Sequence, residues 1–251
     1  MIINTSELTT EDNSINGNRL IYHNHRCHCK VNFKGTGNEI EIGNNVKFPD
    51  GYMLTLPNNC KVKIDDNVSI NGGGLQFCDN ASLTINKQVQ FYYLKRLRIF
   101  QNAEVVIGER TTIGGGIAMD VHRECKLVIG KDCMLSWDIE ILCGDGHVII
   151  DVLTGKPINS PIEEEYKTVI GDHVWIGGES CILSGAVIGT GSIVGYKSTV
   201  NKKFPNNVIV AGIPAEIVRK DVTWSRGSFL DGEKLYEELP AEYKMLTERH
   251  E

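Results

Sequence analysis

The chain has 251 residues with a formal net charge of −6, and its Lys and Arg residues are scattered along the sequence. An acidic balance without a basic cluster argues against nucleic-acid binding, so we expect no nucleic-acid partner. No apolar run approaches the roughly 18 residues needed to cross a bilayer, so we expect a cytoplasmic protein without a membrane span.

Residues 1–29 form a polar N-terminal segment that we expect to cap one end of the domain. It contains four potential metal ligands at alternate positions: His23, His25, Cys27 and Cys29. On a strand these side chains would share a face at intervals of about 7 Å, wider than one tetrahedral zinc ion prefers. No metal is therefore expected, and an end strand is the simpler interpretation.

From about residue 30 an aliphatic residue followed by a polar turn recurs about every 22 residues, at Ile42, Ile64, Ile85, Ile107 and Ile129. Asn and Asp are common in these turns, where they tolerate left-handed backbone geometry. Several of the eight cysteines occupy repeat positions, which favours reduced, packed thiols over disulfides. Such repeats predict a solenoid in which stacked coils share one core.

The repeat tightens to six residues in the second half of the chain, with aliphatic residues at Ile170, Ile176, Ile182, Ile188, Val194 and Val200. A six-residue period fits neither a helix nor an alternating strand alone. Each unit is therefore predicted to be a short strand and a turn, and three units close one triangular coil with the aliphatic residues inside. We expect this all-β solenoid to span residues 30–212.

Two segments lie outside the repeat. A polar, Pro-containing stretch at about 150–168 is predicted to be an external loop inserted in one coil, and long loops of this kind are usually functional. After Gly212 the six-residue period ends. Residues 213–251 are predicted to form a C-terminal extension that is partly helical.

The segments Val169–Gly177, Ile188–Gly195 and Val210–Ala215 resemble the hexapeptide-repeat acyltransferases. The resemblance is greatest to their sugar O-acetyltransferase branch, which includes galactoside and maltose acetyltransferases and enzymes that modify capsule or O-antigen. It implies a left-handed parallel β-helix with an inserted loop and a short C-terminal helical segment. It also implies a homotrimer that binds acetyl-CoA between adjacent subunits and acts on a saccharide.

Acetyl transfer to a hydroxyl group needs a base, and histidine suits this role at neutral pH. In the family the base lies just before the insertion, one coil ahead of the Val-Trp-Ile-Gly unit, and His147 matches this place. An exposed turn histidine without a role is the alternative. Asp145 either orients the imidazole in the acceptor site or is a plain turn residue. His173 competes as base, but its Gly-Asp-His-Val context is typical of a structural turn residue.

The resemblance also implies a cofactor site. Trp175 lines the cleft shared by acetyl-CoA and the acceptor, or packs against a neighbouring subunit, and both can hold. Gly178 is small so that the pantetheine arm lies along the coil. Lys202 and Arg219 match basic positions that meet the CoA phosphates. Glu216 stands where some relatives have a further arginine, which weakens this phosphate site.

Tyr196 and Lys197 stand where relatives have Ala and Gly. Either they displace the pantetheine arm, or Lys197 contributes to cofactor phosphate binding and Tyr196 forms a wall. The favoured function is acetyl-CoA-dependent O-acetylation of a saccharide. The alternatives are an N-acetyltransferase of an amino sugar or nucleotide sugar, and a non-catalytic β-helix that serves in binding or assembly.

Overall fold

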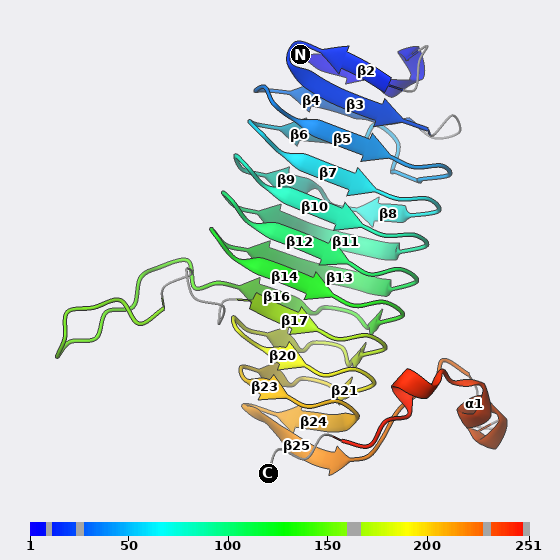
Figure 1. The fold of residues 1–251 in the computed structure, drawn as a ribbon, viewed down its shortest axis with the longest axis vertical. Coiled ribbons are helices and arrows are strands. Elements are labelled where there is room, and N and C mark those ends of the chain that lie inside the picture. Colours follow the sequence, from blue (N-terminus) through cyan, green and yellow to red (C-terminus); the bar gives the residue numbers. More distant parts are fainter. Residues whose placement is uncertain (9–11, 24–27, 160–166, 228–231, 248–251) are drawn as a thin grey trace.

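The computed structural model describes the chain except for residues 9–11, 24–27, 160–166, 228–231 and 248–251. The chain forms a left-handed parallel β-helix of about eight turns, with an inserted loop and a short C-terminal helical segment. The coils stack along one long axis (Figure 1). The sequence prediction of the fold class is therefore confirmed.

One side of the solenoid is a ten-stranded sheet, parallel except for its first hairpin. Its strands are β2 (Asp12–Ile15), β3 (Asn18–Tyr22), β5 (Glu39–Ile42), β7 (Lys61–Ile64), β10 (Ser82–Ile85), β12 (Glu104–Ile107), β14 (Lys126–Ile129), β17 (Lys167–Ile170), β20 (Val187–Ile188) and β23 (Lys203–Phe204). Because β3 pairs in parallel with β5, the parallel part of the sheet begins at Asn18.

A twelve-stranded sheet wraps around the other sides, because the first half of β11 pairs with β8 and its second half with β9. Its strands are β8 (Ser69–Gly72), β9 (Leu75–Phe77), β11 (Gln90–Ile99), β13 (Thr112–Val121), β15 (Met134–Leu135), β16 (Glu140–Cys143), β18 (Trp175–Ile176), β19 (Cys181–Ile182), β21 (Ile193–Val194), β22 (Thr199–Val200), β24 (Val208–Gly212) and β25 (Ala215–Lys220). The first coils are completed by a three-stranded sheet of β1 (Ile2–Asn4), β4 (Lys30–Phe33) and β6 (Met53–Leu56).

The core is a set of aliphatic columns. The anchors predicted from the sequence stand directly above one another, in the order Ile42, Ile64, Ile85, Ile107, Ile129, Ile170 and Ile188. All are fully buried, and so are the inward residues of the six-residue repeat. Burying one such side chain contributes about 1.5 to 3 kcal/mol, which no isolated coil could obtain. The architectural prediction is thus confirmed.

The coils turn at residues with left-handed backbone geometry, which form columns of their own. One column contains Asn45, Asn67, Gln88, Arg110, Asp132 and His173, all with φ between 52° and 62°. At another corner the Asn59 side chain donates to Asn80, which donates to Asn102. The early coils are longer because their strands are longer on both large sheets: β12 has four residues and β13 has ten, whereas β18, β19 and β20 have two each.

The inserted loop lies between β16 and β17. Because β14 pairs directly with β17, the coil closes as if the insertion were absent. The loop projects from one side of the solenoid, and the segment after β25 leaves on the other (Figure 1). That segment contains α1 (Gly232–Glu238) and a 3-10 turn at Ala241–Tyr243. Within the described residues, no helix has the length and apolar character that crossing a membrane requires.

Candidate active site

His147 lies exposed in the loop after β16, beside a cavity of about 190 Å³. The Asn159 side chain braces this part of the loop, since its amide donates to the Asp145 carboxylate at 3.0 Å and to the His147 carbonyl at 2.8 Å. The carboxylate of Asp145 therefore bonds to Asn159 and holds the shape of the loop. The imidazole of His147 faces solvent at the mouth of the insertion.

His122 also lines this cavity. Its ring stacks on Phe100 with centroids 4.8 Å apart. Gly144 has a φ of 101°, and a Cβ there would lie 2.6 Å from the His122 Cβ, so only glycine fits. Cys143 is fully buried, which argues against a cysteine nucleophile at this site.

A second set of candidate residues lies where the twelve-stranded sheet turns a corner. Trp175 is partly exposed on β18, and its indole Nε1 donates to the Ser136 hydroxyl at 3.4 Å. The ring of Trp137 lies over Gly178, because a Cβ at Gly178 would come within 2.8 Å of it. The small size of Gly178 therefore accommodates Trp137, a residue that sequence reasoning missed. The signal was available, since hexapeptide register places Trp137 one coil before Gly178.

Tyr196 and Lys197 belong to the same corner and share one acidic partner. The Tyr196 hydroxyl donates to the Glu179 carboxylate, and the Lys197 ammonium lies 3.2 Å from it. The hydrogen bond to Glu179 raises the pKa of Lys197, and the hydrogen bond from Tyr196 lowers the pKa of Glu179. Lys197 thus carries a full charge at neutral pH in an exposed place.

The two predicted phosphate ligands lie near the C-terminal end of the solenoid. Lys202 pairs with Glu216 at 2.5 Å. Arg219 is exposed on β25, and its backbone stands opposite Ile209 of β24. Glu216 therefore offsets the charge of Lys202.

His173 occupies a closed site. It is 1% exposed, and its ring is sandwiched between Trp224 and Tyr243 with centroids 4.2 Å away on both sides. Nδ1 lies 2.8 Å from the Asp132 carboxylate, and Nε2 lies 2.8 Å from the Trp224 carbonyl. Both ring nitrogens of His173 are therefore engaged within the protein, and neither is open to a substrate.

We call the contacts among Asp132, His173, Trp224, Arg226 and Tyr243 the clasp. The C-terminal segment completes it and forms a wall beside Trp175. The Trp224 indole donates to the His173 carbonyl at 2.7 Å, and its ring lies 6.1 Å from the Trp175 ring. Arg226 pairs with Asp132 at 3.3 Å. Burial alone would raise the pKa of Asp132, but the hydrogen bond from His173 and the nearby charges of His173 and Arg226 lower it.

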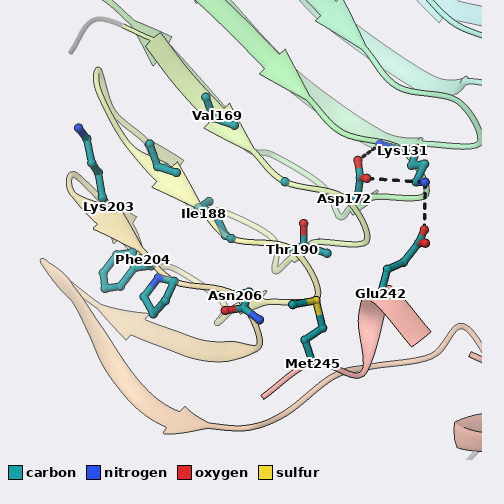
Figure 2. Close-up of a pocket in the computed structure, with 14 residues that line it drawn as sticks. Lys131, Val169, Asp172, Ile188, Thr190, Lys203, Phe204, Asn206, Glu242 and Met245 are labelled. Carbon is teal, nitrogen blue, oxygen red and sulfur yellow. Dashed lines mark hydrogen bonds and ion pairs between the residues drawn. The ribbon is translucent and has the colours of Figure 1, made fainter. Parts of the chain in front are cut away.

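A cavity of about 750 Å³ lies elsewhere, between the ten-stranded sheet and the C-terminal segment. Figure 2 shows Lys131 reaching two carboxylates at one end of it, Glu242 at 3.0 Å and Asp172 at 3.9 Å. Met245 and Phe204 form part of the wall. None of the predicted site residues lines this cavity, so its size alone does not make it the active site.

Metal ligation has no candidate in the described part of the chain, where no three His, Cys, Asp or Glu side chains gather. Of the N-terminal His and Cys cluster, residues 24–27 lie outside the described residues.

Comparisons with known proteins fit this geometry. Residues 167–202 match the family model of the bacterial transferase hexapeptide. The chain is 32% identical over 126 residues to the polysialic acid O-acetyltransferase of Escherichia coli O1:K1 / APEC, a match that covers 50% of this chain and 39% of that protein. It is 30% identical over 193 residues to the polysialic acid O-acetyltransferase of Neisseria meningitidis, covering 76% and 77%. The solved structure of the polySia-specific acetyltransferase NeuO aligns over 85% of this chain and 87% of its own, with 28% identity and a TM-score of 0.58.

Proposed function

We propose that this chain, which belongs to the sugar O-acetyltransferase branch of the hexapeptide-repeat acyltransferases, transfers an acetyl group from acetyl-CoA to a saccharide hydroxyl. The observation that carries the proposal is the placement of His147. Its exposed imidazole stands in the loop after β16, one coil before Trp175, while His173 is closed off. The printed names of the relatives support a glycan as acceptor.

The reaction is a direct transfer. His147 removes the proton from the sugar hydroxyl while the hydroxyl oxygen attacks the thioester carbonyl carbon and forms the new C–O bond. The tetrahedral intermediate then breaks its C–S bond, and the imidazolium of His147 returns the proton to the departing CoA sulfur. No acyl-enzyme forms, which agrees with the burial of Cys143.

The donor lies along the corner that holds Gly178. Because Trp137 covers Gly178, the pantetheine arm passes beside the Trp137 ring, with Tyr196 as a wall. The CoA phosphates meet Lys202 and Arg219 at the C-terminal end, and Lys197 adds a third positive charge near the arm. This assignment uses exposed side chains of all three cationic residues.

The active unit is a homotrimer with sites between subunits. The loop of His147 projects away from its own solenoid (Figure 1). Val152 and Leu153 in that loop are 95% exposed, an unfavourable state for apolar side chains unless a partner covers them. We assign the neighbouring subunit to this role, so that His147 of one chain meets Trp175 of the next, with Asp145 at the acceptor side. A cytoplasmic location suits acetyl-CoA as the donor.

The test is a turnover assay that follows release of the CoA thiol with polysialic acid, free sugars and amino sugars as acceptors. We expect turnover with a saccharide acceptor and a product whose acetyl group is removed by mild alkali, as an ester is. An alkali-stable acetyl group would indicate an amide and N-acetylation. No turnover with any acceptor in the panel would contradict the proposal.

A further inference from the structure

His122 directly follows β13 and lies in one column with Phe100 and Gly144 of the neighbouring coils. Backbone hydrogen bonds align this column. The Phe100 N–H donates to the Val121 carbonyl at 2.9 Å, and the His122 N–H donates to the Cys143 carbonyl at 2.7 Å. The His122 ring lies nearly parallel to the Phe100 ring, with an interplanar angle of 7°. Phe100 is therefore a flat support for the imidazole.

The coil on the opposite side of His122 begins the inserted loop, and two of its glycines approach the His122 side chain. A Cβ at Gly144 would lie 2.6 Å from the His122 Cβ. A Cβ at Gly146 would lie 3.3 Å from the His122 Cε1 and 3.9 Å from each ring nitrogen. His147 directly follows Gly146, and consecutive Cα atoms are about 3.8 Å apart. The His122 ring thus contacts the residue next to the proposed base.

The ring nitrogens of His122 are not used by the fold. Among the residues that the structure describes, none is hydrogen-bonded to either nitrogen. The ring of His173 differs, because both of its nitrogens are bonded within the protein. His122 is half-buried and lines the same cavity of about 190 Å³ as His147. A neutral imidazole has one donor and one acceptor, so His122 offers both to a molecule in that cavity.

We propose that His122 binds the acceptor, by a hydrogen bond from its imidazole to a second hydroxyl of the saccharide, next to the hydroxyl that His147 deprotonates. The inference rests on the proposed function and adds the residue that selects which hydroxyl meets the base. A sugar hydroxyl both donates and accepts, so either tautomer of His122 fits it. Pockets that enclose a whole small molecule start at about 300 Å³. This cavity is smaller and therefore takes one edge of a sugar.

Strand order places His122 on the acceptor side of the base. The strand that leads into the loop of His147, β16, pairs with β13 on one edge and with β19 on the other. His122 follows β13, whereas Gly178, where we place the donor arm, precedes β19. The coil of His147 therefore separates His122 from the coil of Gly178. A group held by His122 approaches the base from the side away from that coil.

The charges around the cavity also suit a hydroxyl better than the phosphates of CoA. The carboxylate of Asp145 lines the cavity and is held by the Asn159 amide at 3.0 Å. Arg123 lines it as well, but Glu124 at 3.8 Å offsets its charge. A carboxylate accepts a hydrogen bond from a hydroxyl, whereas it repels a phosphate.

The experiment compares His122→Phe with the wild-type full-length enzyme, using the saccharide that shows turnover in the panel above. Phenylalanine retains a ring that stacks on Phe100 and removes both nitrogens. His122→Phe should raise the KM for the saccharide about threefold to tenfold, the scale of one hydrogen bond, and leave the KM for acetyl-CoA unchanged. The matched control is His28→Phe, an exposed histidine of the N-terminal segment, which should change neither KM.

Monodeoxy analogues of that saccharide identify the hydroxyl. One analogue should show the same rise in KM with wild-type enzyme, and His122→Phe should add no further rise for it, because the two changes remove one interaction. An unchanged KM for the saccharide in His122→Phe, an equal rise for acetyl-CoA, or additive effects with every analogue would overturn the inference.

Nuclear magnetic resonance of the histidine rings tests binding without turnover. The His122 signals of wild-type protein, identified by their absence in His122→Gln, should shift when the saccharides of the panel are added without acetyl-CoA. Unmoved His122 signals in the presence of a saccharide that the enzyme acetylates would contradict the inference. Shifted signals without any turnover would contradict the proposed function and leave saccharide binding at His122 in place.

Discussion

The ring of His173 lies flat against the ring of Trp224, with centroids 4.2 Å apart, although 51 residues separate the two in the sequence. This stack fastens the C-terminal segment to the coil that carries Trp175. Because Trp224 also lies 6.1 Å from Trp175, the fastening shapes one side of the proposed cleft. The charge of the clasp depends on Asp132, which pairs with both His173 and Arg226.

The first prediction concerns the stability of the clasp at low pH. The folded-state pKa of Asp132 lies below its ordinary value of 3.8, so its carboxylate stabilises the clasp above that pH. This stabilisation is lost as pH falls through the lowered folded-state pKa. Hydrogen exchange of residues 222–227 and 241–247 should show protection at neutral pH and its loss in strong acid, below about pH 4.

Asp132→Asn is the control for this effect. It should loosen the segment already at neutral pH and remove this contribution to the acid dependence, because no carboxylate remains to be protonated. Retained protection of the wild-type segment far below pH 4, or the same acid profile in the variant, would refute the role of Asp132.

The second prediction concerns the core. Ile107 is fully buried in the aliphatic column, whereas its neighbour Val106 points outward from the same strand. Ile107→Ala should lower the free energy of unfolding by about 2 to 5 kcal/mol. Val106→Ala should cost about 1 kcal/mol or less. Chemical denaturation measures both, and equal costs would be inconsistent with the inward column.

The third prediction concerns the cofactor phosphates. Lys202→Ala and Arg219→Ala should each raise the KM for acetyl-CoA with little change in kcat, because ground-state and transition-state binding weaken alike. Glu216→Gln should lower that KM, since it frees Lys202 from its ion pair. Initial-rate kinetics at varied acetyl-CoA concentrations measure this KM. An unchanged KM in both alanine variants would move the phosphate site, with Lys197 as the next residue to test.

The fourth prediction concerns assembly. Wild-type protein should be a trimer by light scattering at micromolar concentration. Leu153→Asp places a charge on an apolar side chain that we assign to the subunit interface, so it should weaken association and activity together. Lys156→Asp, in the same loop and also exposed, is the control and should have a smaller effect. A fully active monomer would be incompatible with sites between subunits.

The repeat made the scaffold predictable. Each of the anchors Ile42, Ile107 and Ile170 is set by local periodicity, and register follows because each coil must bury the same column. The turns were equally predictable from the sequence, since Asn45 and Asn67 take the left-handed geometry that asparagine tolerates. The longer early coils follow from longer strands on both large sheets.

The surroundings of the site were less predictable, because they depend on contacts between distant segments. The sandwich of His173 between Trp224 and Tyr243 joins the repeat to a segment without any period. Trp137 lies over Gly178 because of its ring orientation, which register alone does not give. The sequence motif named the residues of the proposed cleft but not Trp137 and Trp224, which lie beside them.

The central claim is that His147 is the general base, and the most direct measurement is kcat of His147→Ala on a confirmed acceptor. We predict that kcat falls by about 10² to 10⁴, the usual contribution of a positioned proton acceptor, while acetyl-CoA still binds. A variant that retains wild-type kcat with acetyl-CoA and the same acceptor would contradict the account.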